Sequence, residues 1–324
     1  MFFGTTAPYP RQDEVGADED GIGFALRMAT LNGITFNELA RRLASPGHLY
    51  LPADASGAIA YMFGCTPTRL RHAFVDRYFR GEAHGARYLG HKFLRPYHLR
   101  QTRPQVCPAC IRRHLSALAA WSICLVTSCP THGIRLLDRC KCGRPVSWRR
   151  PSVDLCECGS RLTDTDQSIE PADSRELAVS SQAMYLLGPD HFRLRPSDAK
   201  LSAFDAITID TFLRLIWIFG IIDSNSNVVR PESTNRFLPT PEASAVCCRA
   251  YDRIVRLVET RAKCIDVAVH PSALEALRLD CTYPVDIQLV ESLCARLSSS
   301  VLRPRRIRAP RIGLQLPLFG DPND

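Results

Sequence analysis

The strongest constraint on the fold is a set of eight metal-ligand residues that lie between Cys107 and Cys158. Their spacing divides them into two quartets, Cys107-x2-Cys110 with Cys129-x2-His132 and Cys140-x-Cys142 with Cys156-x-Cys158. Four thiolate or imidazole ligands around one metal form a closed, tetrahedral, structural site, and zinc is the metal that such sets bind. Two sites so close in sequence predict a small zinc-ribbon or knuckle module that folds on two Zn²⁺ ions rather than on a large core.

The other Cys residues share no ligand spacing. A chain of 324 residues without a basic and then apolar N-terminal segment does not match a small secreted disulfide scaffold. It has no run of about 18 apolar residues, so we expect no membrane segment. Metal ligation is therefore the preferred role for the two quartets, and the expected location is the cytoplasm.

Positive charge is concentrated around the quartets. Residues 87–158 contain thirteen Lys and Arg residues and three acidic residues, which gives a formal net charge of +10. Seven thiolates and two Zn²⁺ would change this by about −3, which leaves about +7. A local excess of this size favours a polyanionic partner such as DNA or RNA. A solvated basic surface is the alternative.

Two pairs of helices are predicted before the quartets, over residues 22–31 and 36–44 and then 55–63 and 67–79. Each pair has a small residue in its first helix, Gly in its turn and an apolar residue in its second helix, namely Ala29, Gly33 and Leu39, and then Ala60, Gly64 and Leu70. This template is typical of helix-turn-helix units.

Cations of the second pair are candidate nucleic-acid contacts. The predicted helix 67–79 carries Arg69, Arg71, His72 and Arg77, which could reach phosphates or base edges in a major groove. A helical hairpin that binds another protein explains the same residues equally well. Residues 87–106 alternate cations with aromatic residues, and we expect an ordered connector there rather than a nucleic-acid contact.

Within the zinc module we predict a helix over residues 111–126 between the halves of the first quartet. The insert between the halves of the second quartet holds Arg144, Arg149 and Arg150, which predict an exposed basic finger that contacts nucleic acid; a short hairpin is the alternative. A catalytic zinc keeps an open coordination position, and neither quartet offers one. We found no deaminase, metalloprotease or phosphate-loop motif, so we expect no catalytic residues and no enzyme.

The quartets and their surroundings resemble the TniQ family of transposition proteins. The similarity includes Cys107-Pro-x-Cys110, a following Trp-containing segment, Cys129-Pro-x-His132-Gly133 and Leu136-Leu137-Asp138-x-Cys140 before a Cys-Gly knuckle, together with LRMATLNG at residues 26–33. It covers roughly residues 20–160. The chain departs from the family pattern in its second quartet, where Cys140-Lys-Cys142 has a single-residue gap.

The resemblance implies a non-catalytic adaptor that selects the insertion site of a transposon. Such an adaptor recognises target DNA, or docks on an RNA-guided effector complex, and recruits an AAA+ ATPase regulator that engages the transposase. The transposase is thus an indirect partner, and a homodimer is compatible with this interpretation. A zinc-containing helix-turn-helix transcription regulator is the first rival, and a zinc-dependent hydrolase or deaminase is the second.

The second half of the chain predicts an all-α domain, with helices over residues 177–187, 204–222, 240–263, 272–279 and 285–297. The tail carries Arg303, Arg305, Arg306 and Arg308, which favour a nucleic-acid contact over a peptide that binds a protein partner. The expected fold is therefore mainly α, with a flexible arm (1–20), a helix-turn-helix domain (21–86), a double zinc module (87–165), a helical domain (166–302) and a basic tail (303–324).

Overall fold

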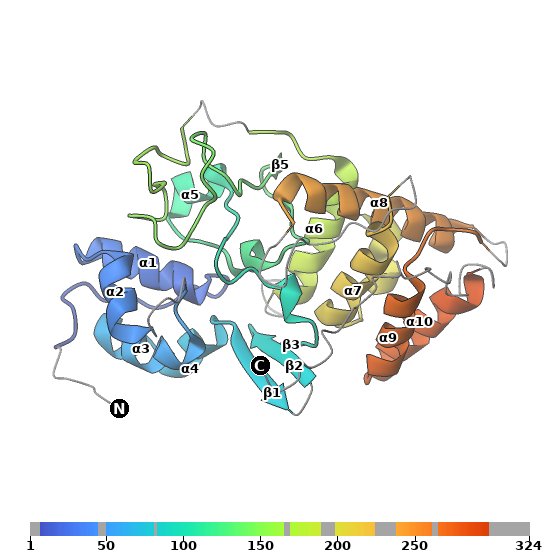
Figure 1. Cartoon of the computed structure of the whole chain (residues 1–324), viewed down its shortest axis with the longest axis horizontal. Helices are drawn as coiled ribbons and strands as arrows, with labels where there is room; N and C mark the ends of the chain where they lie inside the picture. The colour runs from blue at the N-terminus through green and yellow to red at the C-terminus, as the bar shows by residue number, and fades with distance from the viewer. Residues whose placement is uncertain are drawn as a thin grey trace, which may run out of the picture.

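Helices dominate the fold, and two small antiparallel sheets accompany them (Figure 1). The computed structural model describes residues 7–44, 50–80, 83–164, 169–188, 198–223, 238–260 and 265–297. Helices α1–α4 lie at one end of the molecule and α6–α10 at the other, and the quartet-bearing segment lies above α1 in this view and continues toward α6 (Figure 1). Within the described residues no helix has both the length and the apolar character that crossing a membrane requires.

The N-terminal helices follow local sequence signals. Asp20 caps α1 (Gly21–Leu31) by accepting hydrogen bonds from two backbone N–H groups. Thr35 and Glu38 form a capping box at α2 (Phe36–Leu43). The short 3₁₀ helix η1 (Ala53–Ala55) leads into α3 (Ser56–Phe63), and Gly64 ends α3 with a φ of +74°, a conformation that glycine adopts without strain. These three helices are confirmed, whereas their use as DNA-binding units stays a prediction.

The fourth predicted helix, over residues 67–79, is wrong beyond its second turn. Helix α4 spans only Pro67–His72, and the chain then forms β1 (Asp76–Arg80). Strand β1 pairs with β2 (Ala83–Tyr88), which pairs with β3 (His91–Phe93). Leu89 and Gly90 connect β2 to β3 with φ values of +48° and +81°, as a tight two-residue hairpin turn requires. This sheet also occupies part of the predicted connector.

Residues 7–20, part of the arm expected over residues 1–20, contact the N-terminal helices, although most of their side chains are exposed; residues 1–6 lie outside the described parts. Tyr9 stacks on Phe63 with ring centroids 5.5 Å apart. Arg27 of α1 pairs with Asp13 at 2.6 Å and with Glu19 at 2.7 Å. The acidic residues of this segment therefore bind the helices instead of repelling one another in solvent.

The predicted helix over residues 111–126 is also wrong. After the 3₁₀ helix η2 (Pro96–His98), α5 (Pro108–His114) ends at Leu115, whose φ of +48° terminates the helix. A short 3₁₀ helix, η3 (Ala119–Ser122), follows, and then the hairpin of β4 (Ser128–Cys129) and β5 (Ile134–Arg135). Residues 119–129 are all buried. Because this segment is buried on every side, its apolar residues do not mark one face of a helix, so their spacing does not indicate a helix.

The C-terminal helices match the predicted ones within a few residues. They are α6 (Ser174–Leu187), α7 (Ile209–Gly220), α8 (Thr240–Glu259), α9 (Pro271–Asp280) and α10 (Pro284–Arg296), with the 3₁₀ helix η5 (Ala199–Phe204) before α7. Helix α7 is buried along nearly its whole length and packs against α8. The basic tail, with Arg303, Arg305, Arg306 and Arg308, lies outside the described residues.

Candidate metal centres and basic residues

The first quartet converges on one point. The Nδ1 atom of His132 lies 3.5 Å from Cys107 Sγ, 3.3 Å from Cys110 Sγ and 3.4 Å from Cys129 Sγ, and Cys110 Sγ lies 3.6 Å from Cys129 Sγ. A zinc tetrahedron with Zn–S of about 2.3 Å and Zn–N of about 2.0 Å has S–S edges of about 3.8 Å and S–N edges of about 3.5 Å. The four ligand atoms therefore fit one tetrahedral metal ion.

Local structure brings these ligands together from two sides. Cys107 is the N-cap of α5 and Cys110 lies in its first turn, with Pro108 at the start of the helix. Cys129 ends β4, and the N–H groups of His132 and Gly133 donate to its carbonyl oxygen. All three thiols are buried. Hydrogen bonds from the neighbouring thiols, that of Cys107 first, lower the pKa of Cys129.

The second quartet uses the same turn twice. Gly143 and Gly159 have φ values of +80° and +87°, and each donates its N–H to the carbonyl of the Cys three residues earlier. Cys140 Sγ lies 3.8 Å from Cys158 Sγ, and Cys142 Sγ lies 3.9 Å from Cys156 Sγ. These separations match the edge of a Zn–S4 tetrahedron, so the single-residue gaps do not prevent ligation. Hydrogen bonds from Ser160 lower the pKa of Cys158 to about 6.

The two quartets differ in exposure. Cys140 and Cys156 are buried, whereas Cys142 and Cys158 are exposed. The first quartet thus lies inside the fold, and the second opens to solvent at one edge. Both sets fit a metal ion, because in each of them all four ligand atoms lie within 4.8 Å of one another.

The insert of the second quartet is a packed loop, which corrects the exposed finger predicted for it. Trp148 and Arg150 are each 1% exposed, and the Arg150 guanidinium lies 5.2 Å from the centroid of the Trp148 ring. Arg150 also donates to the carbonyl oxygens of Ser147 and Val153. Burial lowers its pKa to about 10. A guanidinium enclosed in this way cannot reach a phosphate, so Arg150 leaves the set of candidate contacts, while Arg144 and Arg149 are exposed as predicted.

The other candidate cations within the described residues are exposed, but they lie on separate elements. Arg69 and His72 lie on α4, whereas Arg77 lies on β1 rather than on a recognition helix. Arg71 pairs with Asp76 at 2.9 Å and faces Asp54 at 3.5 Å. In Figure 1 the loops of the second quartet and α4 lie on opposite sides of α1. The structure therefore keeps α4 apart from the loops of the second quartet.

Sequence reasoning missed a basic turn beside the first quartet. Arg112, Arg113 and His114 are exposed in the last turn of α5, whose N-cap is the ligand Cys107. Arg112 donates to the carbonyl oxygen of Thr163 at 2.7 Å, which fixes this turn against the end of the second quartet's segment. The run of three basic residues directly after a knuckle was the signal that could have identified it.

Comparison with known proteins gives one match. The family model TniQ matches residues 10–136, a range that contains α1–α5, the three-stranded sheet and all four ligands of the first quartet. The second quartet and the C-terminal helices lie outside the matched range. No curated protein matches the chain. The similarity inferred from the spacing of Cys107, Cys110, Cys129 and His132 is thus confirmed over residues 10–136, which match the TniQ family model.

Proposed function

We propose that the chain is a non-catalytic adaptor that takes part in target-site selection during DNA transposition. The observation that carries this proposal is the TniQ match over residues 10–136, which includes a complete first quartet. In this role the chain recognises target DNA or a target-bound nucleoprotein, including an RNA-guided complex. It then recruits an AAA+ regulator, which engages the transposase.

Two structural zinc ions are part of the proposal. Thiolate and imidazole donors with tetrahedral separations favour Zn²⁺ over hard cations, which prefer oxygen ligands. Each quartet supplies four protein ligands and so leaves no coordination position for a water or a substrate. The role of the ligands is structural. Cys107 and Cys110 fix α5, Cys129 and His132 fix the β4–β5 hairpin, and the second quartet fixes the packed loop around Arg150.

Metal analysis of the purified chain tests this assignment. We expect two Zn²⁺ per chain, and one in each of the variants Cys107→Ser and Cys142→Ser, because each substitution opens a different quartet. Two zinc ions in either variant, or none in the native chain, would contradict the assignment.

Nucleic-acid contact is proposed for the exposed cations, in two groups that can be tested separately. Arg69 and Arg77 form the first group, and Arg144 and Arg149 form the second. Neutralising a phosphate contact weakens binding and reduces the slope of log K against log salt by about one. Reversing both charges of the group that contacts DNA should therefore reduce the slope of log K against log salt by about two. Arg278→Glu on α9 is the exposed control and should leave the slope unchanged. Unchanged binding in both groups would assign the contact to the tail or to partner proteins.

A helix-turn-helix transcription regulator is the second candidate, because α1–α2 and α3–α4 are two consecutive helix pairs. Helix α4 has only six residues, which is short for a recognition helix lying in a major groove. Selection of binding sites from random duplexes separates the two functions. A regulator enriches a defined operator by itself, whereas the adaptor requires its transposition partners to act at a target.

A further inference from the structure

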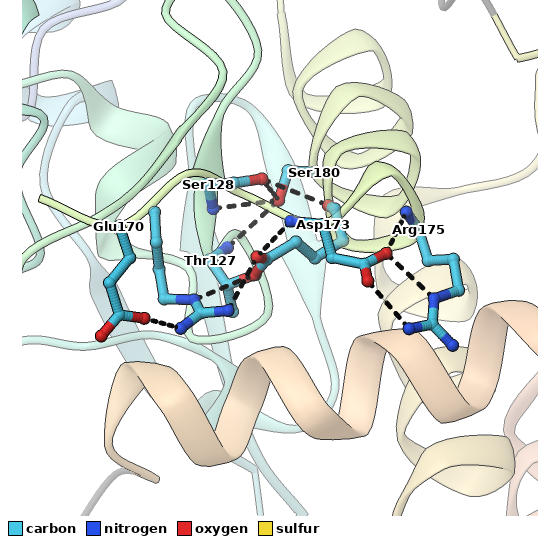
Figure 2. Close-up of polar contacts among 8 residues, drawn as sticks. Thr127, Ser128, Glu170, Asp173, Arg175 and Ser180 are labelled. Carbon is cyan, nitrogen blue, oxygen red and sulfur yellow. Dashed lines mark hydrogen bonds and ion pairs between the residues drawn. The ribbon is translucent and has the colours of Figure 1, made fainter.

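The hairpin that carries half of the first quartet is bonded to α6 through buried polar groups. Ser180 is buried, and its Oγ accepts hydrogen bonds from the N–H of Thr127 at 3.1 Å and of Ser128 at 3.2 Å. The hydroxyl of Ser128 lies 3.0 Å from the same oxygen. Figure 2 shows these three residues facing one another between the strand and α6. Thr127 and Ser128 directly precede the ligand Cys129, so one α6 hydroxyl fixes the backbone that leads to a ligand.

A second contact holds the other strand. The carboxylate of Glu176 is fully buried, accepts from the Thr127 hydroxyl at 3.0 Å and pairs with Arg135 of β5 at 3.1 Å. Arg135 also pairs with Glu170, which Figure 2 shows beside it. The N–H of Ala172 donates to the carbonyl of Gly133, next to the ligand His132. Both strands and the turn of the hairpin are therefore attached to α6 or to the segment before it.

Within the described residues, the backbone orients the His132 ring without help from a hydrogen bond at its far nitrogen. In metal sites the far nitrogen of a ligating His is usually held by a carboxylate or a carbonyl. Here the Nε2 atom of His132 is buried and makes no hydrogen bond within the described parts of the chain. The position of Nδ1 among the three sulfurs consequently depends on the hairpin, and the hairpin depends on α6.

We propose that Ser180 and Glu176 are positioning residues for the first metal site, and that they couple metal binding there to the attachment of α6. The coupling is reciprocal: if α6 raises the metal affinity, the bound metal must stabilise the packing of α6 by the same factor. The second quartet makes none of these contacts with α6. Its loop instead reaches α1, where the Thr30 hydroxyl donates to the carbonyl of Pro151 at 3.2 Å. The two metals thus stabilise different parts of the chain. This inference rests on the metal-binding part of the proposed function and is independent of transposition.

Competition for zinc with a chromogenic chelator tests the proposal on the full chain. Ser180→Ala and Glu176→Gln should lower the affinity of one of the two zinc ions by about 10- to 100-fold, the usual effect of losing groups that hold metal ligands in place. The zinc of the second quartet should keep its affinity and serves as an internal reference. Ser181→Ala, a half-buried neighbour on the same helix, is the matched control and should leave both affinities unchanged.

Hydrogen exchange gives an independent readout that needs no Ser180 variant. In Cys129→Ser, exchange at α6 amides should accelerate about 10-fold or more, whereas Cys142→Ser should leave α6 protected. Unchanged zinc affinity in both α6 variants, or equal α6 protection in the two Cys variants, would overturn the proposal and leave the zinc assignment intact. A native chain that binds no zinc would instead remove the metal-binding part of the proposed function, and this inference with it.

Discussion

Replacing Asp20 with Ala should strongly destabilise the N-terminal half of the chain. Its buried carboxylate accepts four hydrogen bonds: two from the backbone N–H groups of Ile22 and Gly23, and two from the hydroxyls of Tyr88 at 2.6 Å and Ser122 at 2.8 Å. One side chain therefore caps α1 and joins it to β2 and η3. Burial raises the pKa of Asp20, so enclosing its charge offsets part of the gain from these bonds.

The magnitude follows from these contacts. Loss of an N-cap costs about 1 kcal/mol. The buried Ser122 hydroxyl is left without an acceptor, at about 1–3 kcal/mol, and Tyr88 loses a bond to a charged group, worth about 1.5–3 kcal/mol, although its hydroxyl keeps the Ala119 carbonyl oxygen at 3.2 Å. Removing a partly disfavoured buried charge returns some of this, so we expect a net loss of about 2–5 kcal/mol. That is a large share of the roughly 5–15 kcal/mol by which native domains are stable.

Urea unfolding of the zinc-loaded chain measures the effect, with the exposed Asp266→Ala as the control. Asp20→Asn should lose less than Asp20→Ala, because its amide oxygen can still cap α1. If Asp20→Ala unfolds within 0.5 kcal/mol of the control, a spread expected for ordinary surface substitutions, the hydrogen bonds of Asp20 are not what joins these elements.

Three further outcomes are expected. Burial raises the pKa of Asp210 from 3.8 to about 6. The folded chain then binds this proton more tightly than the unfolded chain, so the free energy of unfolding should fall as the pH rises from about 4 to about 6. In urea titrations between about pH 5 and pH 7.5, the free energy of unfolding of Asp210→Asn should exceed that of the wild type by about 1 kcal/mol. Arg150→Ala should lower the thermal midpoint of unfolding by several degrees through lost packing on Trp148, whereas Arg144→Ala, at an exposed position of the same loop, should leave it unchanged. Mild chelation should remove zinc first from the second quartet, because Cys142 and Cys158 are exposed, and the zinc content of Cys142→Ser should then fall more slowly than that of Cys107→Ser.

Local signals in the sequence were sufficient for several features. In each half-quartet one or two residues lie between the two ligands, so a single turn brings them together. The spacing alone identified both groups. Thr35 with Glu38 identified the start of α2, and Gly64 identified the end of α3. In each case the residues that determine the structure are neighbours in the chain.

Features that depend on distant partners were missed. The sheet of β1–β3 is an exception, because its paired residues lie at most eleven positions apart. It was read as a helix and a connector because Leu70, Phe74 and Tyr78 have the spacing of one helical face. Arg150 looked like a surface cation because its stacking on Trp148 in a buried loop leaves no periodic pattern. Glu176 and Ser180 lie about fifty residues from the hairpin that they hold, so no local motif marks them. The predicted nucleic-acid contacts and domain limits stay predictions.

Recruitment of the AAA+ regulator is the central claim, and a direct binding assay tests it. The zinc-loaded chain, immobilised by its N-terminus, is presented with the AAA+ ATPase of the same transposon, with and without target DNA. The adaptor account predicts that the ATPase is retained, that target DNA increases retention, and that removing both zinc ions abolishes it. A folded, zinc-loaded chain that does not retain the ATPase in either condition, yet binds one operator sequence tightly by itself, would contradict the account and support the transcription regulator.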